Sequence, residues 1–301
     1  MESLGECVFE RYDLGFLDKH IQDFDMIVTH QFERLNSYYI DKAIKLQLVA
    51  TPSTGTDHID VSYLADKGIR LVTLNEDREF ISEIHSTAEM SWLLTLAAVR
   101  KFPQLLSRVR HEKSWVNSDL RGYEVAGHTL GIIGFGRLGK RVAKYARVFG
   151  MKVIAYDIDP TVFNGKQPVK QVSLDELLRD ADVISLHAKL TETSYHIINT
   201  ENIRQIKPTA IIVNTARGEL IDSSAVLDAL KCNKLRAIAS DVVSKEFLGT
   251  ELPDDPLVVA SLTDDRIIIT PHVGGATYTA HEKVFDKIAE LSAAAFAEAV
   301  K

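Results

Sequence analysis

Cysteine is scarce in this sequence, and long apolar runs are missing. Only Cys7 and Cys232 occur among 301 residues, without a pairing pattern. This is typical of a reducing cytoplasm, with a single disulfide as the open alternative. No apolar run approaches the ~20 residues that a membrane-spanning helix needs, and the polar start MESLGE differs from a signal peptide. We therefore expect a cytoplasmic protein without a membrane partner.

Positive charge is also in short supply. Lys and Arg number 35 against 42 Asp and Glu, a formal net charge of -7, so nucleic acid is not an expected partner. No group of His, Cys and carboxylate residues has the spacing of a zinc site, and we expect no metal. The hydrophobic content of 46% is typical of a globular protein, and the length predicts two domains.

Strand-like and helix-like segments alternate along the chain, which predicts α/β domains with parallel sheets. We expect strands at residues 7–9, 26–29, 46–50, 69–74, 130–133, 152–156, 183–187, 210–214, 237–243 and 266–270. We expect helices at residues 17–21, 37–44, 61–67, 86–100, 137–149, 174–179, 203–206, 223–231 and 278–300. The charged stretch 75–86 has no clear period and is expected to be a loop.

A glycine-rich turn lies between a strand and a helix in residues 129–159, TLGIIGFGRLGKRVAKYARVFGMKVIAYDID. Gly134, Gly136 and Gly139 have GxGxxG spacing: the first permits a tight turn, the second lets backbone approach a pyrophosphate, and the third lets helix pack on strand. The helix start would face the phosphates. Arg137 lies in the turn, where it either covers the pyrophosphate or stays in solvent.

Asp157 follows the second strand of this segment. Its distance from the turn is close to the ~20-residue offset at which a carboxylate binds both hydroxyls of an adenosine ribose. Because the carboxylate would repel a 2′-phosphate, NAD is favoured over NADP. A plain strand-end carboxylate is the alternative.

Three later segments, 214–222, 240–247 and 270–275, each end a strand and each carry one reactive side chain. Arg217 has the planar fork of donors that holds a carboxylate and polarises a neighbouring oxygen. His272 can exchange a proton near neutral pH, and Glu246 can orient it and stabilise its imidazolium form. Together these groups suit hydride transfer between a 2-hydroxy acid and a nicotinamide. Each alone is more often structural.

The loop TPSTGTDHID at residues 51–60 follows another expected strand. Ligands bind at the carboxyl ends of strands in open α/β sheets. Ser53, Thr54 and Gly55 could therefore present backbone amides to a substrate carboxylate. A plain structural loop is the alternative.

The motifs GIIGFGRLG, LTETSYHIIN, NTARGELID and TPHVGG, with the STAE helix start and the loop at 51–60, resemble the D-isomer-specific 2-hydroxyacid dehydrogenase family. This resemblance implies Arg217, Glu246 and His272 as the catalytic residues. It also implies that Asp241 and the Thr215–Ala216 backbone hold the nicotinamide end. The expected cofactor contacts are Gly134, Gly136, Arg137, Leu138, Gly139, Asp157, His187, Thr193, Thr215, Ala216, Arg217, Asp241, His272 and Gly274. The expected substrate contacts are Ser53, Thr54, Gly55, Arg217 and His272.

The expected fold consists of two Rossmann-like domains with parallel sheets. The NAD-binding domain, residues 96–273, is inserted in a shortened flavodoxin-like substrate domain, residues 1–95 and 274–301. Met90 and Phe247 stand where relatives commonly have histidine and proline. Residues 102–123 form an arm with Trp115 and Tyr123 that has no core of its own, and we expect a homodimer in which this arm is exchanged.

The expected function is NAD-dependent interconversion of a D-2-hydroxy acid and its 2-oxo acid, similar to phosphoglycerate dehydrogenase, on a phosphorylated or sugar-derived acid. The alternative is a non-enzymatic NAD(H)-sensing protein of the corepressor type, since those proteins share the fold and the catalytic residues. The sequence has no long disordered tail for docking a partner, which favours the enzyme.

Overall fold

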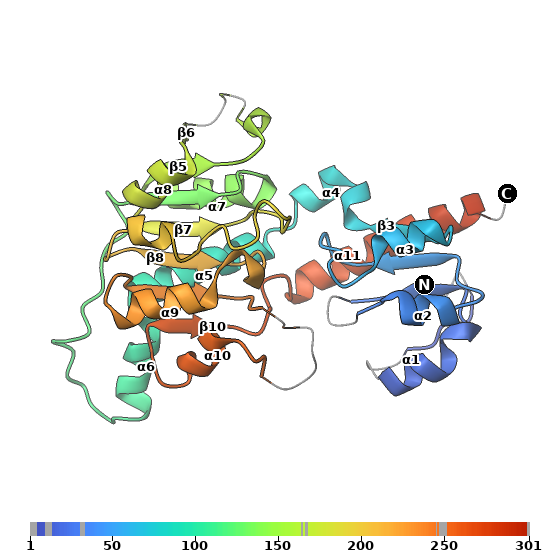
Figure 1. Ribbon diagram of the computed structural model, residues 1–301, viewed down its shortest axis with the longest axis horizontal. Coiled ribbons are helices and arrows are strands. Elements are labelled where there is room, and N and C mark those ends of the chain that lie inside the picture. Colours follow the sequence, from blue (N-terminus) through green and yellow to red (C-terminus); the bar gives the residue numbers. More distant parts are fainter. Residues whose placement is uncertain are drawn as a thin grey trace. The chain divides into compact units, whose positions relative to one another are not determined.

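The computed structural model describes residues 5–9, 14–30, 34–163, 165, 168–244, 246 and 252–299. The chain forms two compact units, drawn in Figure 1. Unit 1 comprises Met1–Ile84 and Thr277–Lys301, and unit 2 comprises His85–Ala276. The divisions at 84/85 and 276/277 differ from the expected ones at 95/96 and 273/274, because the helix that starts at Ser86 packs along its whole length with unit 2.

Unit 1 is built on a parallel three-stranded sheet of β1 (Met26–Val28), β2 (Leu48–Thr51) and β3 (Arg70–Thr73), in that order. All four residues of β2 are buried, as expected of the central strand. The other elements of unit 1 are α1 (Leu14–His20), η2 (Ile21–Asp23), α2 (Ser37–Lys42), α3 (Val61–Asp66), η3 (Leu74–Glu76), α4 (Arg78–Ser82) and α11 (Tyr278–Ala299).

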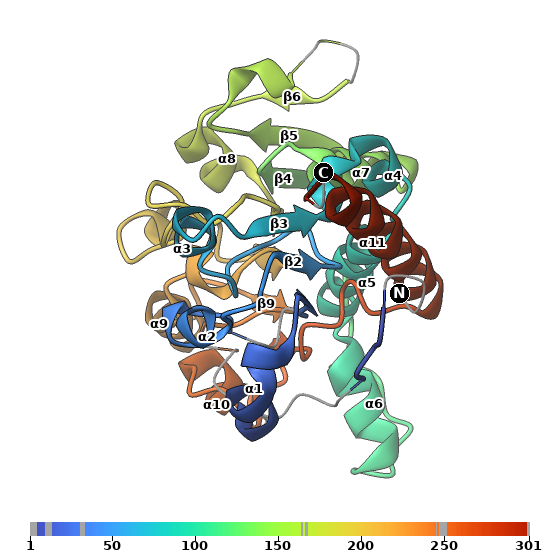
Figure 2. The same cartoon turned by 90° about the vertical axis from the view of Figure 1, so that its right-hand side faces the viewer.

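The two faces of this sheet bury different side chains. Val49 packs with Ile40 and Leu64 on one face, whereas its neighbours Leu48 and Ala50 pack on the other, following the alternation of side chains along a strand. The C-terminal helix α11 covers the second face, where it contacts β2 and β3 (Figure 2). The last helix therefore packs in the same unit as the first strands of the chain.

Two expectations for unit 1 are wrong. Residues 7–9 form no strand, and Val8 and Phe9 are exposed. The stretch 75–86, expected to be a loop, contains η3 and α4. Side chains start both helices: Thr73 and Glu76 form a capping box, and Asp77 accepts a hydrogen bond from the amide of Phe80 at 2.8 Å. Capping therefore sets the local structure where periodicity is weak.

Unit 2 is built on a parallel seven-stranded sheet in the order β10-β9-β8-β7-β4-β5-β6 (Figure 1). Its strands are β4 (Thr129–Ile133), β5 (Lys152–Tyr156), β6 (Lys170–Gln171), β7 (Val183–Leu186), β8 (Ile211–Asn214), β9 (Ala237–Ser240) and β10 (Ile267–Ile269). The order runs outward in both directions from β4, so a topological switch point lies between β4 and β7. The carboxyl end of β4 carries the glycine turn.

Helices cover both faces of the second sheet. Ile211 and Val213 of β8 pack toward α5 and α7, whereas Ile212 packs toward α8, α9 and α10. These and the remaining elements of unit 2 are α5 (Ser86–Val99), α6 (Phe102–Arg110), α7 (Arg137–Val148), η4 (Pro160–Val162), α8 (Leu174–Asp180), η5 (Asn202–Gln205), η6 (Gly218–Leu220), α9 (Ser223–Lys231) and α10 (Pro256–Ser261). In the described part of the chain, no helix combines the length and apolarity needed to cross a membrane.

Candidate active site

The three glycines of the turn after β4 have three different surroundings. Gly134 has φ +92°, and a Cβ there would lie 2.4 Å from the amide nitrogen of Ala188. A Cβ at Gly139 would lie 2.3 Å from the carbonyl oxygen of Gly134. A Cβ at Gly136 would meet nothing within 4 Å. Protein packing therefore requires the first and third glycines, whereas the second leaves open space, which is what a closely bound pyrophosphate needs.

Helix α7 begins at this open space. Gly136 is its N-cap and provides no side-chain cap, so ligand atoms can meet the first amides. Arg137 is half-buried, and both burial and the positive charge of Arg141 lower its pKa. Two guanidinium groups and a helix dipole thus make this end of α7 strongly electropositive, as a phosphate site should be. Leu138 lies in the same first turn.

Asp157 has a role that the sequence analysis missed. Its Oδ2 accepts a hydrogen bond from the amide of Phe135 at 2.7 Å, and its Oδ1 accepts one from the amide of Asp159 at 3.0 Å. The carboxylate therefore holds the glycine turn against the end of β5. Since each carboxylate oxygen has a further lone pair, the same group can still accept ribose hydroxyls.

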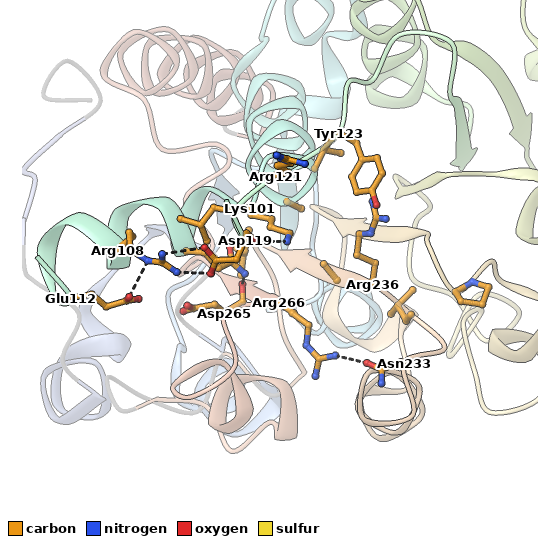
Figure 3. Close-up of a pocket in the computed structure, with 18 residues that line it drawn as sticks. Lys101, Arg108, Glu112, Asp119, Arg121, Tyr123, Asn233, Arg236, Asp265 and Arg266 are labelled. Carbon is orange, nitrogen blue, oxygen red and sulfur yellow. Dashed lines mark hydrogen bonds and ion pairs between the residues drawn. The ribbon is translucent and has the colours of Figure 1, made fainter. Parts of the chain in front are cut away.

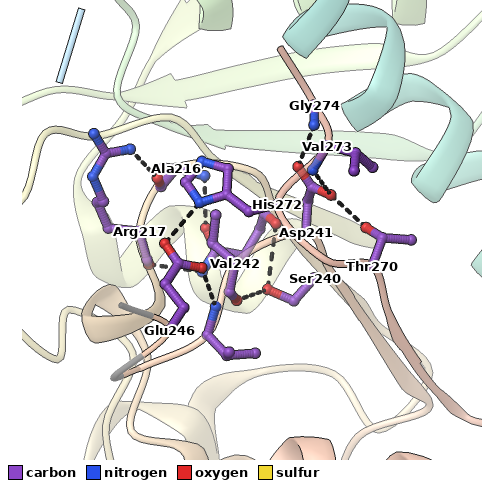
Figure 4. Close-up of polar contacts among 12 residues, drawn as sticks. Ala216, Arg217, Ser240, Asp241, Val242, Glu246, Thr270, His272, Val273 and Gly274 are labelled. Carbon is purple, nitrogen blue, oxygen red and sulfur yellow. Dashed lines mark hydrogen bonds and ion pairs between the residues drawn. The ribbon is translucent and has the colours of Figure 1, made fainter. Parts of the chain in front are cut away.

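Three adjacent strands carry the expected catalytic side chains at their carboxyl ends. Arg217 follows β8, Glu246 follows β9 and His272 follows β10 (Figure 4). The Nδ1 atom of His272 lies 2.7 Å from Oε1 of Glu246. Their side chains are only 15% and 10% exposed, so solvent screens this pair little. The structure thus brings histidine and glutamate into the orienting contact expected from the sequence.

A left-handed backbone places His272. Its φ is 50°, an uncommon conformation for a residue with a side chain, and one often found where function constrains the chain. The amide of His272 donates to the carbonyls of Asp241 and Thr270 at 2.8 and 3.0 Å. These bonds fix the turn that aims the imidazole.

The carboxylate of Asp241 stabilises the same turn by hydrogen bonds. It is 1% exposed, and its carboxylate accepts hydrogen bonds from the Thr270 hydroxyl at 2.5 Å and from the amides of Val273 and Gly274 at 3.0 and 2.6 Å (Figure 4). A Cβ at Gly274 would lie 2.8 Å from Asp241 Oδ2. Asp241 was expected at the nicotinamide end; the structure shows that it braces the His272 loop.

Asn214 and Gly218 shape the segment that carries Arg217, and neither was singled out from the sequence. The Asn214 side chain accepts from the amide of Ala216 at 3.0 Å and donates to the carbonyl of Arg217 at 2.9 Å. A Cβ at Gly218 would lie 2.0 Å from the carbonyl carbon of Val243. Only glycine therefore lets the segment after β9, which leads to Glu246, pass so close to the segment after β8.

His187 and Thr215 directly follow the adjacent strands β7 and β8 and carry buried polar atoms. Nδ1 of His187 and Oγ1 of Thr215 have no hydrogen-bond partner among the described residues, which is costly unless a ligand or water supplies one. Nε2 of His187 lies 2.9 Å from the hydroxyl of Ser185, which lies 3.2 Å from that of Ser91. Burial lowers the pKa of His187 to about 4, so its ring is neutral at pH 7. Thr193 lies farther along, with its hydroxyl 3.1 Å from that of Thr191.

The expected substrate loop belongs to unit 1, after β2. The Ser53 hydroxyl donates to the carbonyl of Gly55 at 2.7 Å, and the Asn75 side chain donates to the carbonyl of Thr54 at 2.8 Å. Within the described structure, the amides of Ser53, Thr54 and Gly55 donate no hydrogen bond. Side chains thus hold the loop while its amides stay available.

No group of three or more His, Cys, Asp or Glu among the described residues could hold a metal ion.

Comparison with known proteins connects this geometry to a family. The profile of the D-isomer specific 2-hydroxyacid dehydrogenase, NAD binding domain, matches residues 92–274. A hydroxypyruvate reductase from Thermotoga maritima is 35% identical over 95% of this chain and 89% of its own length. A D-3-phosphoglycerate dehydrogenase from Methanocaldococcus jannaschii is 38% identical over 90% of this chain, but over only 49% of its own length.

This chain belongs to the D-isomer-specific 2-hydroxyacid dehydrogenase family. Solved structures agree. The D-lactate dehydrogenase of Aquifex aeolicus, complexed with NAD and lactic acid, has a TM-score of 0.80 at 30% identity and covers 93% of this chain and 85% of that one. The NAD-dependent formate dehydrogenase of Staphylococcus aureus, in complex with NAD, has a TM-score of 0.82 at 29% identity, covering 93% and 82%.

As a member of this family, the protein is an NAD-dependent 2-hydroxyacid dehydrogenase. The expected fold class and cofactor are confirmed. The corepressor-type alternative is not favoured, since the matched relatives carry the names of enzymes. The open space at Gly136 and the electropositive start of α7 fit NAD on structural grounds as well.

Proposed function

We propose that this 2-hydroxyacid dehydrogenase works through Arg217, Glu246 and His272. The observation that carries the proposal is the 2.7 Å contact between His272 Nδ1 and Glu246 Oε1, at the carboxyl end of the strand next to the one that carries Arg217. Histidine paired with a buried carboxylate suits proton exchange near neutral pH. Arg217, which follows the strand next to that of Glu246, carries a guanidinium that suits the capture of a 2-hydroxy or 2-oxo acid.

The chemistry of Arg217, His272 and Glu246 suggests a role for each in hydride transfer. Bound NAD supplies the acceptor or donor of the hydride. Arg217 pairs with the carboxylate and polarises the C2 oxygen. His272 takes the hydroxyl proton in the oxidative direction and returns it in the reductive direction, through Nε2, because Nδ1 is engaged with Glu246. Glu246 fixes the ring and stabilises the imidazolium that forms.

The cofactor site is proposed to use Asp157 for the adenosine ribose and the glycine turn for the pyrophosphate. The remaining cofactor contacts expected from the sequence, from Leu138 to Gly274, stay predictions. Two of them gain support from unpartnered buried atoms, Nδ1 of His187 and Oγ1 of Thr215. In unit 1, the amides of Ser53, Thr54 and Gly55 are proposed to hold the substrate carboxylate, because they donate no hydrogen bond within the described structure.

The test of this function is turnover of a panel of 2-oxo acids with NADH, followed by the loss of NADH absorbance. The panel contains glyoxylate, pyruvate, hydroxypyruvate and its phosphate ester, chosen to span the relatives' named activities. We expect saturable reduction of at least one acid, with NADH preferred over NADPH. Binding of NADH without reduction of any acid would refute the proposed enzyme activity in these conditions.

We also propose a homodimer that uses the arm at residues 102–123. Helix α6 at its start has no buried residue, and Trp115 beyond it is 87% exposed. Beside the arm lies a cavity of about 600 Å³, lined by Arg108, Asp119 and Tyr123 of the arm and by Arg236 before β9 (Figure 3). Exposed aromatic groups next to a cavity on the same surface favour a self-complementary contact with a second copy.

Light scattering at micromolar concentration tests the dimer. We expect twice the chain mass for the unmodified protein and the monomer mass for Trp115→Glu. Ile44→Glu is the control, because Ile44 is 80% exposed in unit 1, away from the arm in the sequence. A monomeric unmodified protein contradicts this proposal. We propose a cytoplasmic location, which two unpaired cysteines support because disulfides are rare in a reducing compartment.

A further inference from the structure

A buried carboxylate contacts the segment that carries Glu246. Asp255 is 2% exposed and is the N-cap of α10, where its Oδ1 accepts a hydrogen bond from the amide of Leu257 at 2.8 Å. Its Oδ2 accepts two more, from the hydroxyl of Ser223 at 3.0 Å and from the amide of Ser244 at 3.2 Å. The carboxylate thus connects the start of α9, the start of α10 and the segment that follows β9.

The cap of α10 alone does not explain this buried carboxylate. Serine, threonine and asparagine also cap helices well, and burial of an acidic side chain among uncharged donors is costly. Aspartate differs from these residues because it has two acceptor oxygens, which can receive donors from separate segments. Asp255 uses one oxygen for α10 and the other for Ser244. The connection to Ser244 is therefore what the carboxylate adds to a simple cap.

The peptide group between Val243 and Ser244 has two close contacts. Its N–H donates to Asp255. It also lies so near Gly218 that a Cβ on this glycine would be 2.0 Å from the carbonyl carbon of Val243 and 2.3 Å from the amide nitrogen of Ser244. Since Gly218 directly follows Arg217 in the chain, this peptide joins the segments that carry Arg217 and Glu246.

The position of Glu246 depends on the same stretch of backbone. The amide of Val243 donates to Oε2 of Glu246 at 3.3 Å, while Oε1 lies 2.7 Å from Nδ1 of His272 (Figure 4). Two successive amides, those of Val243 and Ser244, thus donate to two different carboxylates. Glu246 also lies only two residues after Ser244. A shift of the backbone at Ser244 would therefore move both the Glu246 side chain and the amide that holds it.

We propose that Asp255 is a positioning residue for Glu246. By fixing the amide of Ser244, it holds the Glu246 carboxylate within hydrogen-bond distance of His272. The inference rests on the proposed function, in which Glu246 orients His272 and stabilises its imidazolium. Asp255 acts on the reaction only through Glu246, and a displacement of about 1 Å at a catalytic group is enough to slow a reaction by up to roughly 10²-fold.

The test is a double-mutant cycle between Asp255→Ser and Glu246→Ala, with kcat measured for the best acid of the panel at saturating NADH. Serine keeps a cap for α10 but lacks the second oxygen, which receives the amide of Ser244. We expect Asp255→Ser to lower kcat about tenfold in the unmodified protein. It should lower kcat less than about twofold in Glu246→Ala, where the group to be positioned is missing.

Asp222→Ser is the matched control. Asp222 caps α9 by accepting hydrogen bonds from the amides of Ser224 and Ala225 at 3.0 and 3.2 Å, so this variant also replaces a capping carboxylate in unit 2. It should leave kcat nearly unchanged. Asp255→Asn keeps one acceptor oxygen and should retain part of the lost kcat. It takes the place of Asp255→Ser in the cycle if thermal unfolding shows that the serine variant does not fold.

The outcomes separate this inference from the function on which it rests. An unchanged kcat in folded Asp255→Ser would overturn the positioning role and leave the role of Glu246 intact. A loss by the same factor in both backgrounds would do so as well, because it is the result expected of a merely structural residue. An unchanged kcat in Glu246→Ala, or no reduction of any acid while a fluorescence titration still shows bound NADH, would overturn the proposed function and this inference with it.

Discussion

The carboxyl edges of the two sheets are built from different chemical groups. In unit 2, charged side chains follow three adjacent strands, and one pair, His272 and Glu246, is in contact at 2.7 Å. In unit 1, the loop after β2 is held by the neutral groups of Thr51, Ser53 and Asn75. The first edge brings a histidine and a carboxylate into contact, whereas at the second edge the amides of residues 53–55 donate no hydrogen bond within the described structure.

This difference suggests a division of labour. Proton transfer requires an ionisable pair whose orientation is fixed, and unit 2 fixes it with a left-handed residue and the buried carboxylate of Asp241. Holding a carboxylate requires only fixed donors that bind the ground state and the transition state alike. Changes to His272 and Glu246 in unit 2 should therefore act on kcat, and changes to the loop of unit 1 should act on KM.

The largest expected effect is that of His272→Ala. Without the imidazole, no side chain that we assign exchanges the hydroxyl proton, so kcat should fall about 10³-fold, within the usual range for a lost general acid or base. NADH affinity, measured by fluorescence titration, should change little. His128→Ala is the matched control, since His128 is exposed just before β4 and lies outside the arm. Near-normal turnover of His272→Ala would exclude this histidine as the proton carrier.

A smaller effect is expected for Glu246→Gln, which keeps the size of the side chain and removes its charge. The charge of Glu246 is proposed to stabilise the imidazolium from which His272 gives its proton to the 2-oxo acid. We therefore expect kcat for reduction to fall about 10- to 100-fold, while KM for the acid changes less. The measurement is steady-state reduction of the 2-oxo acid at saturating NADH. An unchanged kcat would mean that Glu246 does not act through its charge.

The glycine turn and the candidate catalytic residues could be proposed from the sequence because their signals are local. The spacing of Gly134, Gly136 and Gly139 and the short motifs around Arg217 and His272 are each read within a few residues. The side chains that stabilise these segments by hydrogen bonds were not predictable in this way. Asp157 reaches the amide of Phe135, and Asn214 shapes its own turn, only once strand order and side-chain direction are known. Such contacts depend on tertiary structure, which a motif does not specify.

The errors in secondary structure have the same origin. Residues 7–9 are apolar enough for a strand, but in the described structure no neighbouring strand pairs with them. The helix α10, begun by the Asp255 cap, and the short strand β6 were not expected. The apolar character of α5 follows from its packing on the sheet of unit 2 and on helix α7, which the sequence does not specify. In these cases the secondary structure and its burial depend on the strands and helices that pair or pack with the segment.

An effect of about one order of magnitude is expected for Asp157→Ser, on cofactor choice. The carboxylate would repel the 2′-phosphate of NADPH, so its removal should narrow the preference for NADH roughly tenfold. Serine cannot replace both oxygens that receive the amides of Phe135 and Asp159, so NADH affinity itself should also fall. Titration of both cofactors, at equal ionic strength, measures the ratio. Equal affinity of the unmodified protein for NADH and NADPH contradicts the assignment.

The smallest effect, and the sharpest check on the comparison, is expected for Thr51→Val in unit 1. Thr51 is fully buried, and its hydroxyl lies 3.2 Å from that of Ser53 and 3.3 Å from Nε2 of His58. Valine nearly keeps the shape but removes the hydroxyl that contacts both Ser53 and His58, which should lower the free energy of unfolding by about 1 kcal/mol and loosen the loop. If the amides of this loop only hold the carboxylate, KM for the 2-oxo acid should rise about threefold while kcat stays within twofold. This pattern indicates the loss of an interaction that is equally strong in the ground state and the transition state.

Thr200→Val, at an exposed threonine of unit 2, controls for the substitution itself. Steady-state kinetics at saturating NADH separates the two constants. A fall in kcat with KM unchanged would show that the loop acts in the transition state, and the contrast between a binding edge and a chemical edge would no longer hold.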